Sequence, residues 1–402
     1  MNKRKVVFDM ALNIVATAIP TFVLQLLILP NLAKFMSDDN YGLLVTVLAF
    51  LNVMPSTMGN VLNNIRLLYN ENYVETNNEG DFNILLAILE GVNFLSVTVF
   101  LFYYDSNLTL FTVLMTGITA LLWLAREYFL VAFRLIINYR AILLCNVIMV
   151  GGYGIGYLLF LGTKVWQVIY ISGLLCSLIY CFIRSRLWKE PFKITPLFKR
   201  TSTQGLLLLI AKILNRLLVY ADKIIVFPVL GGALVSVYYA ATVFGKVVSL
   251  MRTPVNSVVL TYLAKAKKKT DSMLKSALLV GIAVCAVGYI VCVLISRPVL
   301  SILYPQYVDS AMNYIYLTTG TTVLYALISI VDPFIMKFFD MKWQIAINGG
   351  TVVVYLALGI SFMIPWGLMG FCVGALLTNV LKLLFMIFIY YRCKALDLEK
   401  AE

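Results

Sequence analysis

The chain contains no histidine, and only 13% of its 402 residues are charged. Histidine is the commonest general acid–base residue and a common zinc ligand, so its absence argues against both kinds of site. The seven cysteines form no Cys-x-x-Cys pair, which excludes the usual zinc and redox motifs. Gly245-Lys246 lacks the upstream glycine and the following hydroxyl residue of an ATP-binding loop. We therefore expect no cofactor, no metal site and no ATP hydrolysis.

Apolar residues, by contrast, make up 61% of the chain, and the mean hydropathy is +0.91. Values this high are typical of proteins that cross a membrane several times. The apolar segments are long enough to cross a bilayer as helices, so the sequence predicts an all-α, polytopic membrane protein with about twelve spans. The predicted spans are residues 9–33, 41–65, 82–104, 108–132, 141–162, 164–184, 205–230, 233–263, 276–297, 310–336, 343–364 and 367–391.

The distribution of Lys and Arg predicts that both termini lie in the cytoplasm. With twelve spans, 23 of the 32 basic residues fall on the cytoplasmic side, 3 fall outside and 6 lie within spans. This bias accounts for most of the net charge of +13, so no nucleic-acid partner is expected. The outer loops are short and leave no room for a catalytic domain outside the membrane.

A polar stretch near the middle of the chain divides the spans into two sets of six. Residues 185–204 contain prolines and many basic residues, and they are predicted to form a cytoplasmic linker. We expect a six-helix N-terminal lobe at residues 1–184 and a six-helix C-terminal lobe at residues 205–402.

The two halves also show a weak internal similarity. Aligning Pro30 with Pro228 places Tyr41 on Tyr239. Because an even number of spans lets both halves start from the cytoplasm, the similarity predicts a parallel repeat.

Fixed positive charge inside the predicted spans is the most unusual feature of the sequence. A charge at mid-bilayer is costly unless it faces protein, water or a ligand. A rise of about 1.5 Å per residue places Arg216 and Lys246 level with each other near the midplane. The intramembrane cations that we expect to bind substrate are Lys212, Arg216, Lys223, Lys246 and Arg252.

Structural interpretations of these cations remain open from the sequence. Lys212 and Arg252 lie near the inner boundary, where long side chains extend toward the headgroups. Asp222 is placed to neutralise a cation from another helix. A cation paired in that way would not be available to a ligand.

Polar residues in the first two spans are candidates for contacts with a hydroxylated substrate. Asn13, Thr17 and Gln25 belong to a stripe with a spacing of four residues, and Asn60 lies in an unusually polar part of the second span. Such a stripe either packs against another helix through hydrogen bonds or lines a pore.

Without an ATP site, transport must draw on an ion gradient, the membrane potential or the supply of substrate. The acidic candidates for coupling to a proton or cation are Asp222, Glu90 and Asp332. Pairing with a neighbour such as Arg126 is an equally good interpretation of Glu90.

Several short motifs are spread along the chain: Tyr41-Gly42, Ala221-Asp222-Lys223-Ile224-Ile225-Val226, Leu230-Gly231-Gly232-Ala233, Val237-Tyr238-Tyr239-Ala240-Ala241 and Trp366-Gly367-Leu368-Met369-Gly370. They resemble those of the polysaccharide flippases, which translocate O-antigen and capsule repeat units and belong to the multidrug/oligosaccharidyl-lipid/polysaccharide exporter superfamily. The resemblance covers nearly the whole chain. Where that family commonly has Asp-Arg, this chain has Asp222-Lys223, which keeps the charge.

The resemblance implies a V-shaped, two-lobe transporter in the bacterial cytoplasmic membrane. Its substrate would be an undecaprenyl-diphosphate-linked oligosaccharide, moved from the inner to the outer leaflet by alternating access. Membrane lipids, a polysaccharide polymerase and glycosyltransferases are the partners that this implies. Cations suit the phosphates of such a headgroup, and amide or hydroxyl groups suit its sugars.

The alternatives are another exporter of the same superfamily, either a multidrug or cation antiporter or a lipid II-type flippase, and a membrane enzyme. A multidrug or cation antiporter would favour acidic residues in its pathway, whereas the central charges here are mostly positive. A membrane enzyme that builds polysaccharide is disfavoured by the lack of histidine, long outer loops and paired carboxylates, so we do not expect an enzyme.

Overall fold

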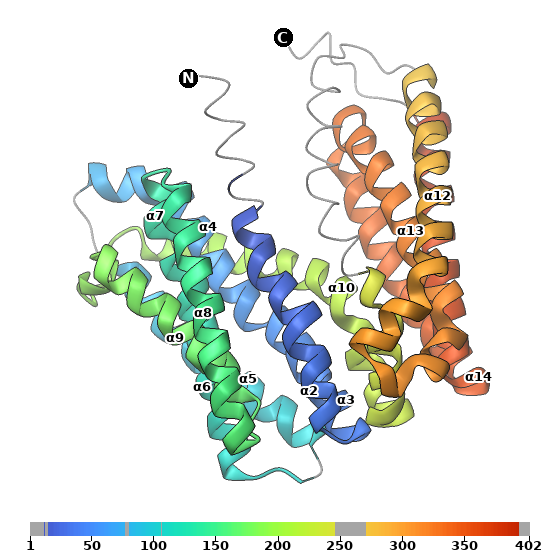
Figure 1. Cartoon of the computed structure of the whole chain (residues 1–402). Coiled ribbons are helices and arrows are strands. Elements are labelled where there is room, and N and C mark those ends of the chain that lie inside the picture. Colours follow the sequence, from blue (N-terminus) through green and yellow to red (C-terminus); the bar gives the residue numbers. More distant parts are fainter. Residues whose placement is uncertain (1–11, 13–14, 77–79, 106, 246–270, 394–402) are drawn as a thin grey trace. The chain divides into compact units, whose positions relative to one another are not determined.

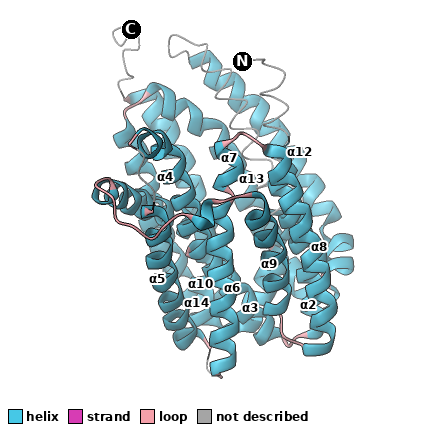
Figure 2. Cartoon of the chain, turned by 90° about the vertical axis from the view of Figure 1, so that its left-hand side faces the viewer, coloured by secondary structure: helices cyan, strands magenta, loops and turns pink. Residues whose placement is uncertain are grey.

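The computed structural model describes residues 12, 15–76, 80–105, 107–245 and 271–393 (Figure 1). Within these ranges the regular structure is entirely helical, and the helices are joined mostly by short turns (Figure 2). Ten of the helices are long and apolar enough to cross a membrane. The prediction of an all-α, multi-pass membrane protein is confirmed.

Two glycines break the longest helices. Gly231 (φ 81°, ψ 171°) interrupts α10, Phe198–Ala241, and Gly367 (φ 57°, ψ −140°) interrupts α14, Met341–Arg392. A positive φ is easily adopted only by glycine, and the sequence predicts a turn at both positions. If each of the two breaks is counted as a boundary between two spans, the ten long helices of the described residues correspond to the twelve predicted spans. The eighth predicted span continues into residues outside the described ranges.

The helical contacts divide the chain into two compact units. The first contains residues up to Leu32 and from Leu43 to Ile224, and the second contains Ala33–Gly42 and the chain from Ile225. The expected division into lobes 1–184 and 205–402 stays a prediction.

The first unit is built from a helix of residues 15–35, which includes a π-helical turn, and from the helices that follow it. Each later helix packs against one or more of its neighbours, and α8 and α9 form the most extensive pair. The elements are η1 Leu24–Ile28, α2 Leu29–Phe35, α3 Asp38–Val53, α4 Pro55–Glu75, α5 Asp81–Tyr104, α6 Leu110–Phe129, α7 Val131–Leu135, α8 Tyr139–Thr163, α9 Gln167–Arg184, η2 Leu187–Lys189 and the first part of α10.

Small residues allow α8 and α9 to lie close together. A Cβ atom added at Gly152 would lie 2.7 Å from the carbonyl oxygen of Ser172, and one at Gly156 would lie 2.6 Å from the Cα of Ile169. Glycine at both positions therefore lets the two helix backbones approach each other closely.

The predicted linker, residues 185–204, is bound to α4 and to the first residue of α5. Arg66 donates two hydrogen bonds to the carboxylate of Glu190, at 2.8 and 2.6 Å. The buried Asp81 carboxylate accepts hydrogen bonds from the backbone N–H and the hydroxyl of Thr195, at 2.7 and 2.6 Å. The last part of this segment is helical, because α10 begins ahead of the predicted start at residue 205.

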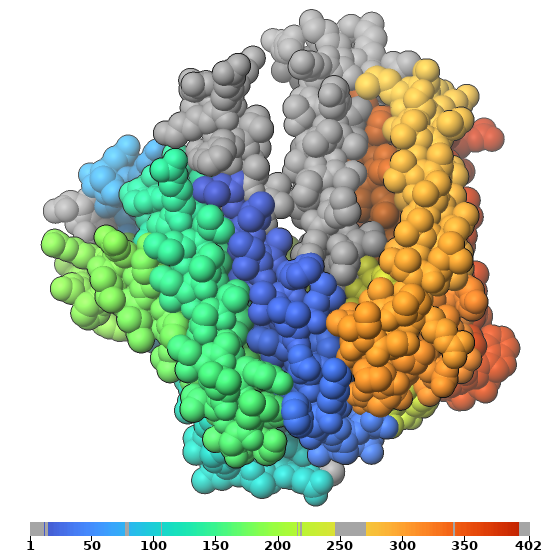
Figure 3. All heavy atoms as spheres, viewed as in Figure 1, coloured from blue at the N-terminus to red at the C-terminus, as the bar shows by residue number. Residues whose placement is uncertain are grey.

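The second unit holds the last part of α10, α12 Asp271–Leu303, η3 Pro305–Tyr307, α13 Val308–Phe338 and α14. In the most apolar window of α12 only 6% of the residues are buried, and this helix forms an outer surface of its unit (Figure 3). An exposed apolar helix of this kind suits contact with lipid.

A cluster of four tyrosines joins the first turn of α3 to the rest of the second unit. Tyr41 packs against Tyr239, Tyr304 and Tyr307 with ring centroids 6.0 to 6.3 Å apart. The hydroxyl of Tyr307 donates to the Asp38 carboxylate at 2.8 Å. These contacts explain why Ala33–Gly42 belongs to the second unit although its neighbours in sequence belong to the first.

The close approach of the two halves of α14 generates a first prediction. A Cβ atom at Gly370 would collide with the carbonyl oxygen of Phe362, whereas Gly349 in the same helix has open space around it. We expect Gly370→Ala to destabilise the protein by about 1–3 kcal/mol, because the two segments must separate. Gly349→Ala should be neutral or stabilising by up to about 1 kcal/mol. Thermal unfolding in lipid nanodiscs measures both, and equal melting temperatures would contradict the packing.

The linker contacts generate a second prediction. Arg66 and Glu190 have side chains only 8% and 9% exposed, so Glu190→Gln leaves a buried guanidinium without its counter-charge. We expect a loss of about 3–5 kcal/mol. The exposed Glu71→Gln serves as the matched control and should change little. A double variant, Arg66→Met with Glu190→Met, should recover much of the melting temperature; failure to recover would mean that the pair is not what stabilises this region.

Candidate anion-binding site

Three asparagines on α4 form the centre of a polar cluster in the first unit. Asn60, Asn63 and Asn64 are spaced by three and four residues, so one face of the helix presents all three amides. Asn64 donates to the Asn60 side-chain oxygen at 3.2 Å. Asn63 donates to the backbone oxygen of Glu127 at 2.8 Å, which fixes α4 against α6.

Two cations from other helices bind these amides. Lys212 on α10 donates from Nζ to Oδ1 of Asn60 at 2.7 Å. Arg134 on α7 donates to Oδ1 of Asn63 at 2.6 Å and to Oδ1 of Asn64 at 3.1 Å. We call Lys212, Arg134 and the three asparagines the cation–amide cluster. It connects α4, α7 and α10 within the first unit.

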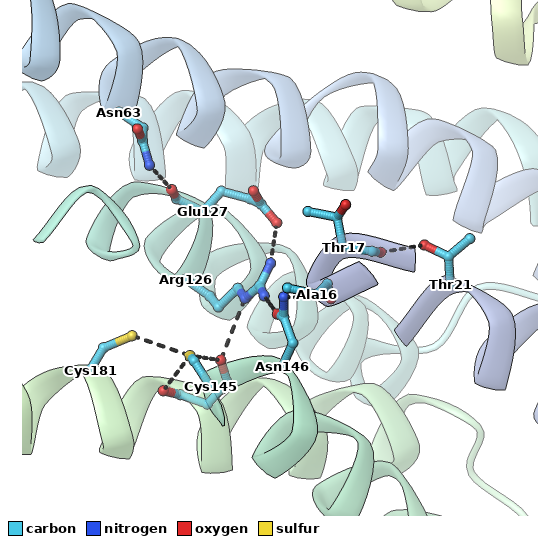
Figure 4. Close-up of polar contacts among 10 residues, drawn as sticks. Ala16, Thr17, Thr21, Asn63, Arg126, Glu127, Cys145, Asn146 and Cys181 are labelled. Carbon is cyan, nitrogen blue, oxygen red and sulfur yellow. Dashed lines mark hydrogen bonds and ion pairs between the residues drawn. The ribbon is translucent and has the colours of Figure 1, made fainter. Parts of the chain in front are cut away.

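A third cation lies next to this cluster in a different environment (Figure 4). Arg126 on α6 donates to the Glu127 carboxylate at 2.6 Å and also to Oδ1 of Asn146 on α8. Asn146 in turn donates to the backbone oxygen of Ala16 at 2.8 Å. Arg126 therefore has a carboxylate partner and ties α6, α8 and the first helix together.

The electrostatics of the two groups differ for that reason. Among the described residues, Lys212 and Arg134 form no salt bridge, and their partners are neutral amides. Glu127 acts on Arg134 only from beyond hydrogen-bond distance. Arg134 and Arg216 lie close enough to Lys212 to repel it. Both cations of the cluster are half-buried. The arrangement holds positive charge in place without neutralising it, which is what an anionic ligand requires.

The structure brings together two of the residues proposed from the sequence, Lys212 and Asn60. Lys223 is instead bound to its neighbour Asp222, with Nζ 2.5 Å from the carboxylate. The predicted role of Lys223 in binding substrate stays a prediction. Among the described residues, Asp222 forms its salt bridge with Lys223 of the same helix and not with a cation from another helix.

Arg216 is half-buried on α10, one turn from both Lys212 and Tyr220. It acts electrostatically on both residues. The Asp222 carboxylate, which was considered as its partner, is bonded to Lys223. Its predicted role in binding substrate stays a prediction.

The other residues proposed to bind substrate fall into two groups. On the first helix, Thr17 is exposed and accepts a hydrogen bond at its backbone oxygen from the Thr21 hydroxyl at 3.4 Å (Figure 4), and Gln25 is half-buried; their predicted role in binding substrate stays a prediction. The remaining three, Lys246, Arg252 and Asn13, lie outside the described residues.

The acidic candidates also have distinct environments. Glu90 on α5 was considered as a partner of Arg126, and this is wrong because Arg126 binds Glu127 and Asn146. Asp332 on α13 accepts a hydrogen bond from Gln344 at 3.2 Å. In the part of the chain that the structure describes, no group of three or more potential ligands fits a metal ion.

Arg134 is not among the binding residues that the sequence predicts. It belongs to the cluster because the short helix α7 packs against α4, a contact between segments far apart in the sequence. The polar run from Asn60 to Asn64 was the available signal that the facing helix would carry a cation.

Neither a protein-family model nor a curated protein sequence matches the chain. Solved structures do match. A lipid II flippase, MurJ, in an inward closed conformation has a TM-score of 0.70 and 12% identity, covering 95% of this chain and 86% of that chain. An inward-facing multidrug resistance transporter of the MATE family and the MOP superfamily has a TM-score of 0.57 and 14% identity, covering 97% and 99%.

A MATE transporter of Vibrio cholerae, VcmN, in its bent form has a TM-score of 0.51 and 11% identity, covering 98% of this chain and 97% of that chain. Identities this low show similarity of fold and nothing finer. These neighbours are transporters and flippases rather than enzymes. The chain is a multi-pass membrane protein with the fold of the MOP-superfamily transporters.

Proposed function

We propose that this protein is a flippase that moves undecaprenyl-diphosphate-linked oligosaccharide repeat units from the inner to the outer leaflet of the bacterial cytoplasmic membrane. Transport would proceed by alternating access between two six-helix lobes and would supply the synthesis of a surface polysaccharide such as O-antigen or capsule. Glycosyltransferases would build the substrate and a polymerase would join the exported units.

The observation that carries the proposal is the cation–amide cluster. Lys212 and Arg134 are held by Asn60, Asn63 and Asn64 instead of by carboxylates. An amide oxygen positions a cation but leaves its charge available, so a diphosphate can bind without first breaking a salt bridge. Arg134 suits a forked contact with phosphate oxygens, and Lys212 suits a mobile point contact.

The amides would take part in recognition as well. A sugar hydroxyl both donates and accepts hydrogen bonds, and so does an asparagine side chain. The prenyl tail needs no binding site of its own because it stays in lipid. Arg216, Lys246 and Arg252, with Asn13, Thr17 and Gln25, remain proposed contacts along the same pathway.

A lipid II-type flippase is the second candidate, favoured by the TM-score of 0.70 to a lipid II flippase. Its substrate is also a lipid-linked diphosphate sugar, so the cation–amide cluster fits both. A multidrug or cation antiporter fits less well, because a cationic substrate would be repelled by Lys212 and Arg134.

The cluster generates a third prediction. Lys212→Gln and Arg134→Gln each remove one charge-assisted contact to phosphate, worth about 1.5–3 kcal/mol. We expect the rate of flipping at low substrate concentration to fall about 10- to 100-fold. The assay measures arrival of a labelled lipid-linked oligosaccharide in the outer leaflet of proteoliposomes.

The exposed linker residue Lys199 provides the matched control, because Lys199→Gln removes the same charge outside the cluster. Membrane abundance is measured for all three variants. A fall in flipping that only follows a fall in abundance would contradict a binding role. Competition between repeat-unit lipids and lipid II separates the two candidate functions. When both lipids are present, the true substrate should reduce the flipping of the other.

The proposed orientation generates a fourth prediction. Lys193 and Thr163 are both exposed, and the bias in basic residues places them on opposite sides of the membrane. With the seven native cysteines replaced, Lys193→Cys should react with an impermeant maleimide only from the cytoplasmic side and Thr163→Cys only from the outside. Labelling of both from one side would overturn the topology.

A further inference from the structure

In the described chain, seven buried side-chain atoms lack a hydrogen-bond partner. Three of the seven belong to one pair of residues on α5. They are Oε2 of Glu90 and both Nδ2 and Oδ1 of Asn93. Asn93 is completely buried. Residues three positions apart face the same side of a helix, so the carboxyl and the amide are neighbours. A carboxylate oxygen without a donor is unusual at such a place, because a buried ionised group needs compensation.

The other two acidic candidates for ion coupling do not share this property. Asp222 has the Lys223 ammonium at 2.5 Å, and Asp332 accepts from the Gln344 amide at 3.2 Å. Each of these carboxylates therefore has a hydrogen-bond donor. Glu90 is singled out by the structure, not by the sequence.

No charged side chain of the described residues compensates Glu90. α5 packs against α4 and α6, its Phe100 stacks on Phe50 of α3, and its Tyr104 reaches the backbone of α10. Arg66 on α4 is paired with Glu190, and Arg126 on α6 is paired with Glu127. The other charged residues of these helices that have partners elsewhere are Asp81, which accepts from Thr195, Asp38 and Asp39, which accept from Tyr307 and Ala233, Lys212, which binds Asn60, and Asp222 and Lys223, which bind each other. Glu71, Glu75, Lys199 and Arg200 are exposed, and Arg216 is half-buried on α10.

We propose that Glu90 is a proton-binding site, in which the carboxyl group is protonated while it is buried and donates its hydrogen bond to Oδ1 of Asn93. The proton satisfies both the carboxyl oxygen and the amide oxygen. It also removes the negative charge from a medium of low dielectric constant. On release, the O–H bond of the carboxyl group breaks, the proton passes to water and the carboxylate remains.

A metal ion fits this place less well than a proton. Hard cations such as Ca²⁺ and Mg²⁺ take six or more oxygen ligands in about octahedral or larger shells. The pair offers the Glu90 carboxylate and one amide oxygen, and the helical backbone carbonyls are already used. A proton requires one acceptor.

Protonation becomes a means of coupling if the first unit changes shape during transport. A conformation that admits water to Glu90 would stabilise the ionised carboxylate and release the proton, and burial would take it up again. Each cycle could then carry one proton. This step rests on the proposed flippase function, whereas the protonation itself does not.

Infrared spectroscopy of the purified protein in lipid nanodiscs tests the site without any transport assay. At neutral pH the wild type should show the C=O stretch of a protonated carboxylic acid. Glu90→Gln should remove that band, Asn93→Leu should shift it by removing the acceptor, and the exposed Glu71→Gln should leave it unchanged. Absence of the band in the wild type, or its persistence in Glu90→Gln, would overturn the proposal.

A second measurement separates the site from the coupling. Flipping of a labelled polyprenyl-diphosphate oligosaccharide is followed in proteoliposomes with and without a proton gradient. Stimulation by the gradient should be lost in Glu90→Gln and kept in Glu71→Gln. Equal stimulation in both would overturn the coupling while the infrared band still supports the proton site. If the wild type shows the infrared band but does not flip the lipid, the proposed function is overturned and the proton site at Glu90 is still supported.

Discussion

A cation removed from water must find its partner within the protein, and the first unit is organised around this constraint. An apolar interior offers neither a counter-charge nor a hydrogen-bond acceptor, so these cations bring separate segments of the chain together. Arg66 ties the linker to α4, Arg126 ties α6 to α8, and Lys212 ties α10 to α4. The helices of this unit are thus positioned by polar contacts as well as by apolar packing.

The choice of partner separates structural cations from available ones. A carboxylate neutralises a guanidinium and stabilises the fold, as Glu190 does for Arg66. An amide stabilises the position of the charge but not the charge itself, as Asn60 does for Lys212. Burial alone would not distinguish these cases. The identity of the accepting group does, because it decides whether a ligand must compete for the cation.

The sequence predicted the helical class and the glycine turns and named two residues of the cation–amide cluster, Lys212 and Asn60, without predicting their contact; the rest was missed for identifiable reasons. Gly231 and Gly367 could be found because a positive φ favours glycine. The pairs Arg126–Glu127 and Asp222–Lys223 join sequence neighbours, which do not normally face each other on a helix, so other partners were expected.

Arg134 was missed because its position depends on how the chain leaves α6. Helical periodicity predicts which residues share one face of one helix. The contact of Arg134 with Asn63 depends instead on how two helices are oriented relative to each other. Glu90 shows the converse. Its presence in a span was evident from the sequence, but the lack of a partner became visible only once its surroundings were known.

The contact between Tyr41 and Tyr239 has an evolutionary consequence. These two residues occupy equivalent positions in the proposed repeat, and Asp38 and Ser236, at the same separation in sequence, are also hydrogen-bonded to each other. If the halves arose by gene duplication, a residue in one half now packs against its equivalent in the other half. A substitution in one copy would change the selection acting on its twin. These positions would therefore diverge together, while lipid-facing residues of α12 would be free to drift alone.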